Sequence, residues 1–391
     1  MTTVKRKVLF CATKDIHFYS FHLPYFKWFK EKGYEVHTVS GDFLPLPYVD
    51  YKYTIPIQRT PFSFQNGKAL LQLKRIIDTH QFDIIHCHTP MGGMLTRIAA
   101  RAARKKGTKV IYTAHGFHFY KGAPTQNWLF YYPLEKRLSS FTDCLITINK
   151  EDYKLATTRH FKADSIKHVH GVGIDLNHYK PAIPSKKAAL RIKYGYAPDD
   201  YILFYAAEFN KNKNQQLLIH ALALLKNTVP KARLLFAGDG PLQEQCKQLA
   251  GQLGVQNKVN FIGFRNDIDQ LLQLSDVAVA SSLREGLPVN LLEAMASGLP
   301  ILATNNRGHR ELVKNNQNGF IPIANAPSLF ATKILYLYNN PDIEARLGET
   351  GQLFVQNYAL SKVKNEMADI YSQYITEDND DSKSKYYRAY L

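Results

Sequence analysis

Apolar and polar positions follow two alternating patterns along this chain. Short apolar runs typical of buried strands are followed by stretches in which apolar residues recur every three or four positions, as in helices. In the first half this pattern predicts strands at 8–12, 35–40, 55–57, 82–88, 109–113 and 144–149, and helices at 23–32, 67–80, 92–106 and 127–139. Such alternation predicts an α/β fold with a parallel sheet covered by helices, which binds ligands at the C-terminal ends of its strands.

The second half repeats this alternation after a break. Glycines and prolines cluster in HGVGIDLNHYKPAIP, residues 170–184, where helical periodicity stops. Strands are then predicted at 201–207, 232–237, 259–261, 275–280, 300–304 and 320–323, and helices at 215–226, 242–253, 289–296, 328–338, 341–358 and 361–376. We therefore expect an N-terminal domain at 1–175, a C-terminal domain at 176–358, a final helix within 359–376 and a polar tail at 377–391.

Two glutamates separated by seven residues stand out in the second half. Glu285 follows a predicted strand and is followed by Gly286-Leu287-Pro288, and Glu293 lies about two turns into the next helix. Free N–H groups at the start of that helix favour an anion. A ligand with hydroxyls at both ends and phosphate between them, such as a nucleotide sugar, suits this arrangement. The simpler alternative is a helix-terminal carboxylate and a solvated helix residue.

The segment EGLPVNLLEAMASGLPILAT, residues 285–304, resembles the signature of GT-B-fold retaining glycosyltransferases of family 4. The resemblance covers nearly the whole chain. It implies two Rossmann-like domains facing a cleft, a C-terminal helix that returns to the first domain, and sugar transfer with retention of anomeric configuration. It also implies that Glu285 contacts donor-sugar hydroxyls, that the amides of Gly286 and Leu287 hold the diphosphate, and that Glu293 holds the ribose.

The resemblance assigns further residues to the donor site. The segment AAEFNKNKN, residues 206–214, places Lys213 on the family's phosphate-binding lysine. Glu208 stands where an arginine is common, which leaves open whether Lys211 replaces that cation. Phe264 and Arg265, which follow a predicted strand, are assigned to donor binding as well.

The catalytic and acceptor residues are expected on loops of the first half. His115 lies just beyond the strand at 109–113, and the resemblance implies that it approaches the donor sugar; a loop histidine bonded to backbone is the alternative. Many family members carry glycines where this chain has Lys14, Asp15 and His17. We expect these three to contact an acceptor phosphate or to act as a base.

The sequence predicts no metal and no cofactor. His86 and His88 alternate on one strand, but no third ligand has suitable spacing. The carboxylates of Asp267-Ile268-Asp269 are expected to cap a helix, and cations and amides then meet the diphosphate charge. No full G-x-G-x-x-G occurs, so no nicotinamide or flavin site is expected. The four scattered cysteines are expected to be buried free thiols.

Charge is distributed unevenly along the chain. Residues 1–180 hold 27 of the 50 Lys and Arg residues but 13 of the 33 acidic residues, so they carry +14 of the net +17. The stretch 91–106 is predicted to form a basic amphipathic helix, with Arg97, Arg101, Arg104 and Lys105 on one side. We expect peripheral binding to anionic lipid of the inner membrane leaflet, with packing on the sheet as the alternative.

Other properties narrow the expected location and function. Neither a bilayer-spanning apolar run nor a signal peptide is recognised, which predicts a cytoplasmic protein at the inner face of the cell membrane. The segments FHLPYFKWFKEKGYEV and KVIYTAHGFHFYKG resemble bacterial exopolysaccharide, capsule or lipid-linked-oligosaccharide glycosyltransferases. A UDP-sugar donor and a polyprenyl-diphosphate-linked sugar acceptor follow from that resemblance. The alternatives are a GT-B UDP-sugar 2-epimerase and a nucleic-acid-binding protein, although no nucleic-acid recognition motif supports the latter.

Overall fold

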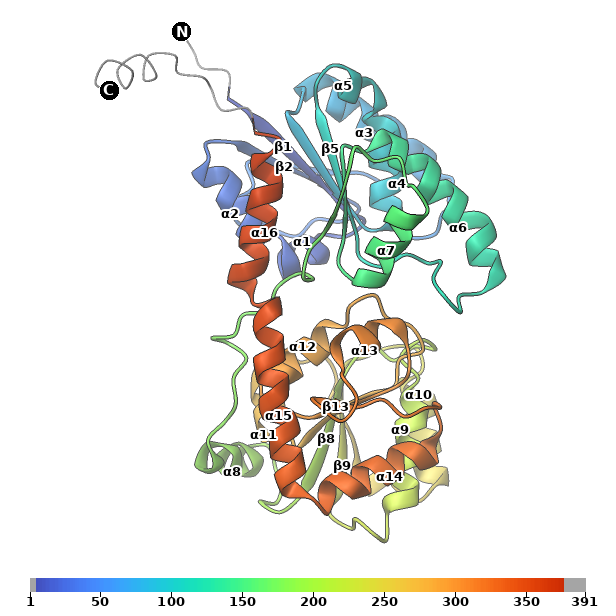
Figure 1. Ribbon diagram of the computed structural model, residues 1–391, viewed down its shortest axis with the longest axis vertical. Coiled ribbons are helices and arrows are strands. Elements are labelled where there is room, and N and C mark those ends of the chain that lie inside the picture. The colour runs from blue at the N-terminus through green and yellow to red at the C-terminus, as the bar shows by residue number, and fades with distance from the viewer. Residues whose placement is uncertain (1–4, 376–391) are drawn as a thin grey trace, which may run out of the picture.

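The computed structural model describes residues 5–375, which form two α/β domains stacked along the long axis of the molecule (Figure 1). The first contains a parallel sheet with strand order β3-β2-β1-β4-β5-β6-β7. Its strands are β1 (Lys7–Cys11), β2 (Glu35–Ser40), β3 (Tyr51–Thr54), β4 (Ile84–His88), β5 (Lys109–Ala114), β6 (Cys144–Thr147) and β7 (Ser165–His168). Its helices are α1 (Asp15–Phe21), α2 (Leu23–Glu31), α3 (Gln65–His80), α4 (Pro90–Ala99), α5 (Arg101–Lys105), α6 (Thr125–Leu138) and α7 (Lys150–Thr158).

The second domain has a parallel sheet with strand order β10-β9-β8-β11-β12-β13. Its strands are β8 (Tyr201–Ala206), β9 (Ala232–Ala237), β10 (Val259–Phe261), β11 (Val277–Ala280), β12 (Ile301–Ala303) and β13 (Gly319–Phe320). Its helices are α8 (Pro184–Lys193), α9 (Gln215–Leu225), α10 (Gln243–Gln252), α11 (Ile268–Leu274), α12 (Val289–Ala296), α13 (Arg307–Leu312), α14 (Pro327–Tyr338) and α15 (Pro341–Val355). The two-domain α/β fold class predicted from the sequence is confirmed.

Both sheets reverse their strand order at an internal pair, β1/β4 in the first and β8/β11 in the second. In open α/β sheets, ligands bind beyond the C-terminal ends of the strands at such a reversal. Thr13 and Thr89 follow the first pair, and their hydroxyls lie 2.8 Å apart. Lys213 and Glu285 lie in the loops that follow the second pair. The topology therefore brings the predicted site loops of each domain to one sheet edge.

The last helix, α16 (Leu360–Ser372), lies beside α2 on the first domain (Figure 1). The Tyr371 hydroxyl is 2.8 Å from Nδ1 of His86, and its ring contacts Trp28 and Phe29. The chain passes between the domains twice, near Ile174 and near Tyr358. These two segments are hydrogen-bonded to each other, because the Ile174 N–H donates to the Tyr358 carbonyl at 2.9 Å. The predicted return of the C-terminal helix is confirmed, whereas the predicted tail at 377–391 lies outside the described residues.

Several local predictions were wrong. The expected loop at 13–18 is mostly the helix α1, because the buried carboxylate of Asp15 accepts hydrogen bonds from the Ser40 hydroxyl and the Leu44 N–H and fixes this corner. The third strand is β3, just before the predicted 55–57. The elements α7, β7 and α8 were not predicted at all.

The predicted basic face at 91–106 is wrong for Arg97 but right for Arg101 and Lys105, which are exposed. This stretch forms two helices, α4 and α5, and Arg97 is buried rather than wet. Arg97 donates to Glu135 at 2.9 Å, and Arg104 donates to Asp143 at 2.9 Å. Periodicity alone could not show these acidic partners on other elements. No helix among residues 5–375 is both long and apolar enough to cross a bilayer.

Substitutions of Tyr371 test how firmly α16 is anchored. Tyr371→Phe leaves Nδ1 of the buried His86 without its partner and should cost about 1–3 kcal/mol. Tyr371→Ala also removes a fully buried ring and should cost about 3–5 kcal/mol. Urea unfolding followed by circular dichroism measures both, with the half-exposed Tyr19→Phe as the matched control. Equal stability of Tyr371→Ala and wild type would contradict this anchoring.

Candidate active site

Glu285 and Lys213 form an ion pair at the C-terminal edge of the second sheet. Their Oε1 and Nζ atoms lie 2.6 Å apart, and both side chains are largely shielded from solvent. Lys213 is held in place because the Ser281 hydroxyl donates to its carbonyl at 2.7 Å. Glu208 is exposed and accepts a hydrogen bond from Asn210. The fold thus unites the motif glutamate with the predicted phosphate-binding lysine.

Glu293 lies on α12, two turns from the loop that carries Glu285. Burial raises the pKa of Glu293 to about 7, and a hydrogen bond from the Tyr179 hydroxyl partly offsets this rise. The carboxyl is therefore poised between its neutral and charged forms near neutral pH. In its charged form, such a group can accept hydrogen bonds from the hydroxyls of a ligand.

The loop between the two glutamates offers unpaired backbone donors. Neither the N–H of Gly286 nor that of Leu287 donates to a residue in the described part of the chain. Both precede α12, whose N-terminus carries a partial positive charge. This arrangement agrees with the predicted diphosphate contacts, which stay a prediction.

Phe264 and Arg265 lie beyond the end of β10. Phe264 is exposed, and its N–H donates to Asp239 at 3.2 Å. Arg265 donates to Asp267 at 2.8 Å and lies over the ring of Tyr194. The Arg265 hydrogen bond holds the pKa of Asp267 at about 2. Asp267 occupies the N-cap position of α11 but binds Arg265 and Tyr194 instead of capping backbone.

The first domain forms the opposite wall of the candidate site and contains a cavity of about 680 Å³. Lys14, His17 and His115 line it, together with apolar side chains such as Met94 and Leu134. Asp15 does not line it: it is fully buried and held by Ser40, Leu44 and Lys52. The contact of Lys14 and His17 with an acceptor stays a prediction, and the geometry gives Asp15 a role in shaping the loop.

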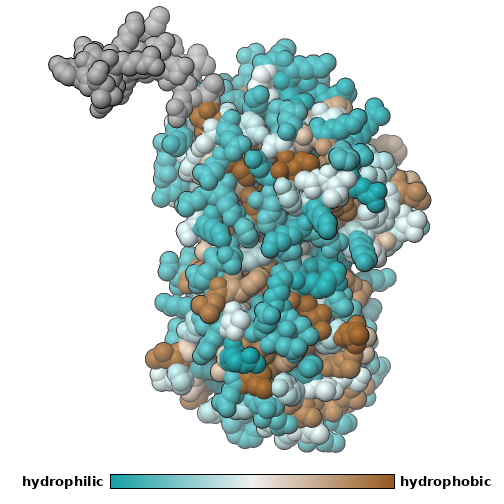
Figure 2. Space-filling model, in the orientation of Figure 1, coloured by the Kyte–Doolittle hydropathy of each residue, from teal (hydrophilic) through white to brown (hydrophobic). Residues whose placement is uncertain are grey.

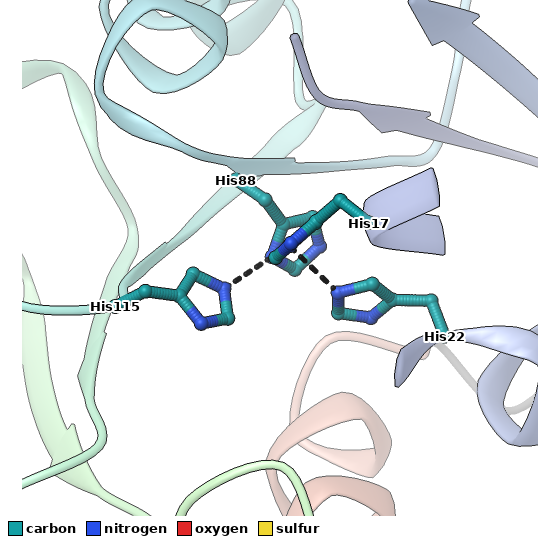
Figure 3. A group of neighbouring side chains, drawn as sticks. All are labelled: His17, His22, His88 and His115. Carbon is teal, nitrogen blue, oxygen red and sulfur yellow. Dashed lines mark hydrogen bonds between the residues drawn. The ribbon is translucent and has the colours of Figure 1, made fainter. Parts of the chain in front are cut away.

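His115 lies at the end of β5 within a group of four histidines (Figure 3). Its Nε2 atom is 3.5 Å from Nδ1 of His88. Burial lowers the pKa of His115 to about 4, so the ring is neutral at neutral pH. Its backbone lies against the second domain, because a Cβ added to Gly286 would lie 2.2 Å from the His115 carbonyl oxygen.

Arg307, which the sequence analysis missed, joins the two domains. Its guanidinium pairs with the buried Asp152 and donates to the carbonyls of Phe117 at 2.7 Å and Glu285 at 3.2 Å. It also lies 4.6 Å over the Tyr120 ring. A lone arginine at the start of a short helix carries no sequence signal for such a role, since Asp152 lies 155 positions away.

Two Rossmann-like domains that face each other are the arrangement of GT-B glycosyltransferases, and the second domain of this chain carries the E-x7-E motif. Residues 7–149 match the family described as glycosyl transferase 4-like, and residues 186–354 match glycosyl transferases group 1. EpsD of Bacillus subtilis, a protein assigned as a glycosyltransferase, is 51% identical over 95% of this chain and 98% of its own. The chain therefore belongs to the group 1 glycosyltransferases and is an enzyme of that family.

More distant proteins share the sequence pattern or the fold. The Escherichia coli UDP-Gal:alpha-D-GlcNAc-diphosphoundecaprenol alpha-1,3-galactosyltransferase is 28% identical over 78% of this chain and 79% of its own. Anabaena HepE, solved with UDP and glucose, has a TM-score of 0.77 at 22% identity, covering 94% and 100% of the two chains. WaaG, a glycosyltransferase involved in lipopolysaccharide biosynthesis, gives 0.73 at 18%, covering 93% and 99%. Both structures share the GT-B fold.

Glu293→Gln tests how much the buried negative charge of Glu293 destabilises the fold, separately from its part in ligand binding. Because the folded-state pKa is raised, the stability that neutral Glu293 contributes is fully present at low pH and is lost as pH rises from about 4.5 to 7. The variant should therefore be more stable than wild type at pH 8, by up to about 3 kcal/mol, and similar at pH 4.5. Thermal unfolding across this range measures the difference.

The same variant should bind UDP roughly 10–100-fold more weakly, because hydrogen bonds to a charged carboxylate are lost. Isothermal titration calorimetry at pH 8 measures this change. Unchanged UDP affinity would show that Glu293 does not bind the nucleotide, even if the stability measurement gives the expected result.

Gly286→Ala tests the contact between the domains. The added Cβ would approach the His115 carbonyl oxygen to 2.2 Å, so the two backbones would have to separate. We expect transfer activity to fall roughly 100-fold, as small misplacements at reacting centres do, with the thermal midpoint nearly unchanged. Gly67→Ala, where an added Cβ meets nothing within 4 Å, is the control. Full activity of Gly286→Ala would show that catalysis does not need this contact.

Proposed function

We propose that the enzyme transfers a sugar from a UDP-sugar to a polyprenyl-diphosphate-linked sugar, with retention, in bacterial exopolysaccharide biosynthesis. The observation that carries this proposal is the convergence of the Glu285–Lys213 pair and the unpaired amides of the second domain on the His115 loop of the first. The relatedness to EpsD and to the undecaprenol-diphosphate galactosyltransferase supports the acceptor class.

The donor would lie along α12 and the loop before it. Lys213 and the amides of Gly286 and Leu287 meet the diphosphate, Glu293 meets the ribose, and Glu285 meets the sugar hydroxyls. Phosphate would compete with Glu285 for Lys213, because the two side chains form an ion pair at 2.6 Å. Diphosphate binding would thereby release Glu285 to accept hydrogen bonds from the sugar. Charge on the leaving group is met by fixed donors and a cation, which is effective in a site shielded from water.

The acceptor would enter through the cavity of the first domain. Lys14 is a cation at the wall of this cavity, and it lies 3.6 Å from Asp42. The neutral His115 ring offers a hydrogen-bonding group towards the reacting sugar. The acceptor hydroxyl attacks on the face from which the diphosphate leaves, which gives retention without an enzyme nucleophile. Approach of the two domains excludes water and limits donor hydrolysis.

Exposed apolar side chains favour a membrane-facing position for the cavity entrance. Phe62 is 91% and Phe64 98% exposed, next to a segment whose Pro61 lines the cavity. Leu129 and Phe130 are exposed on α6, a helix that also lines the cavity, and a small brown group lies among teal and white residues at that edge of the upper domain in Figure 2. Aromatic side chains beside basic residues suit peripheral attachment to anionic lipid.

Acceptor-dependent release of UDP tests the function. The protein is mixed with a panel of UDP-sugars and a polyprenyl-diphosphate-linked sugar in anionic or neutral vesicles, without added Mg²⁺ or Mn²⁺. One donor should give acceptor-dependent UDP release, faster on anionic vesicles, which Glu285→Gln lowers at least roughly 100-fold. The exposed Glu349→Gln is the matched control. Proton NMR of the new linkage shows retention.

Three results would contradict the proposal. UDP-sugar conversion without acceptor would favour a 2-epimerase. Equal rates on anionic and neutral vesicles would show that lipid charge does not contribute to activity. Wild-type rates for Glu285→Gln would place the donor elsewhere.

A further inference from the structure

Four histidines from distant parts of the chain converge behind the cavity wall. His17 comes from α1, His22 from the corner between α1 and α2, His88 from the end of β4, and His115 from the end of β5. Figure 3 shows the four rings gathered around a common centre. One ring nitrogen from each lies within 4.8 Å of those from the other three.

The distances between these nitrogens approach those of a tetrahedral metal site. Nε2 of His17 lies 3.2 Å from Nε2 of His22, and Nε2 of His115 lies 3.5 Å from Nδ1 of His88. Imidazole nitrogens at about 2.0–2.1 Å from Zn²⁺ in tetrahedral geometry lie about 3.3–3.4 Å from one another. Two pairs thus already have the required separation, and the others need shifts of an ångström or so.

A neighbouring histidine shows how a purely structural ring is held in this fold. His86 is buried, and both of its nitrogens are bonded, to the Tyr371 hydroxyl and to the Thr113 hydroxyl, each at 2.8 Å. His22 and His88 are equally buried, but Nδ1 of His22 and Nε2 of His88 have no partner within the described chain. Hydrogen bonds therefore satisfy both nitrogens of His86, whereas His22 and His88 each have one nitrogen near another histidine of the group and one nitrogen without a partner among the described residues.

The chemistry of the group favours a particular kind of ion. It contains imidazoles and no carboxylate or thiolate, and imidazole suits Zn²⁺ and neighbouring divalent transition metals rather than Mg²⁺ or Ca²⁺. Imidazole binds such ions through a ring nitrogen that carries no proton. The ring of Phe10 is parallel to that of His88, with centroids 6.3 Å apart, and makes part of the surroundings apolar.

We propose that His17, His22, His88 and His115 bind one divalent transition metal ion, Zn²⁺ being the best match. His17 and His115 line the cavity, so an ion can reach the group from there. The ion ties the corner between α1 and α2 to the ends of β4 and β5. It places two positive charges at the inner end of the cavity.

Metal binding is measured directly, independently of sugar transfer. The purified full-length protein is stripped with a chelator, loaded with Zn²⁺ or Co²⁺, dialysed and assayed by mass spectrometry for metal. We expect about one ion per chain, a visible absorption band typical of tetrahedral Co²⁺, and a higher melting temperature with Zn²⁺. His22→Ala should weaken binding roughly 100-fold, and the exposed His220→Ala should not change it.

His17→Ala provides a second test in case His22→Ala does not fold, because His17 lies at the cavity wall and is not fully buried. It should lose the tetrahedral Co²⁺ spectrum and weaken Zn²⁺ binding by at least roughly tenfold. Failure of the folded wild-type protein to retain stoichiometric Zn²⁺ or Co²⁺ would overturn the proposal. So would equal metal binding by wild type, His17→Ala and His22→Ala.

Discussion

A close backbone contact between the two domains sets the geometry of the site. The loop of Gly286 lies so near the His115 carbonyl that a side chain on residue 286 would not fit. Arg307 spans the same junction and pairs with Asp152, both of them buried. A buried charge without its partner is strongly destabilising, so the arginine and the aspartate favour the closed arrangement. The loop of Glu285 and Gly286 is therefore held against the His115 loop of the first domain.

The first domain depends on the end of the chain for its own core. Tyr371 of α16 bonds His86 on the central strand β4 and packs among aromatic rings of α2. His170 and Glu366 form a further pair at 2.7 Å between the linker and α16. Because the chain leaves the first domain and returns to it, its two crossings constrain the angle between the sheets.

Strand and helix positions were largely predictable from local pattern. The bounds of β2, β9, β10 and α12 agree with those expected, because each is a compact apolar run or a helical repeat between clear boundaries. The predictions failed where contacts between residues far apart in the sequence decided the local structure. α1 begins at Asp15, whose buried carboxylate is bound from β2 and β3. Arg97 is buried because Glu135 on α6 neutralises it.

The sequence by itself determined the fold class, the family and the E-x7-E donor motif, because these lie in short contiguous segments with characteristic spacing. Only the tertiary structure showed the Arg307–Asp152 junction and the histidine group. Their members lie far apart in the chain, and parallel strands bring their C-terminal ends to one sheet edge whatever the intervening length. His86 and His88 looked like a pair in sequence, yet the fold assigns one to Tyr371 and the other to His17, His22 and His115.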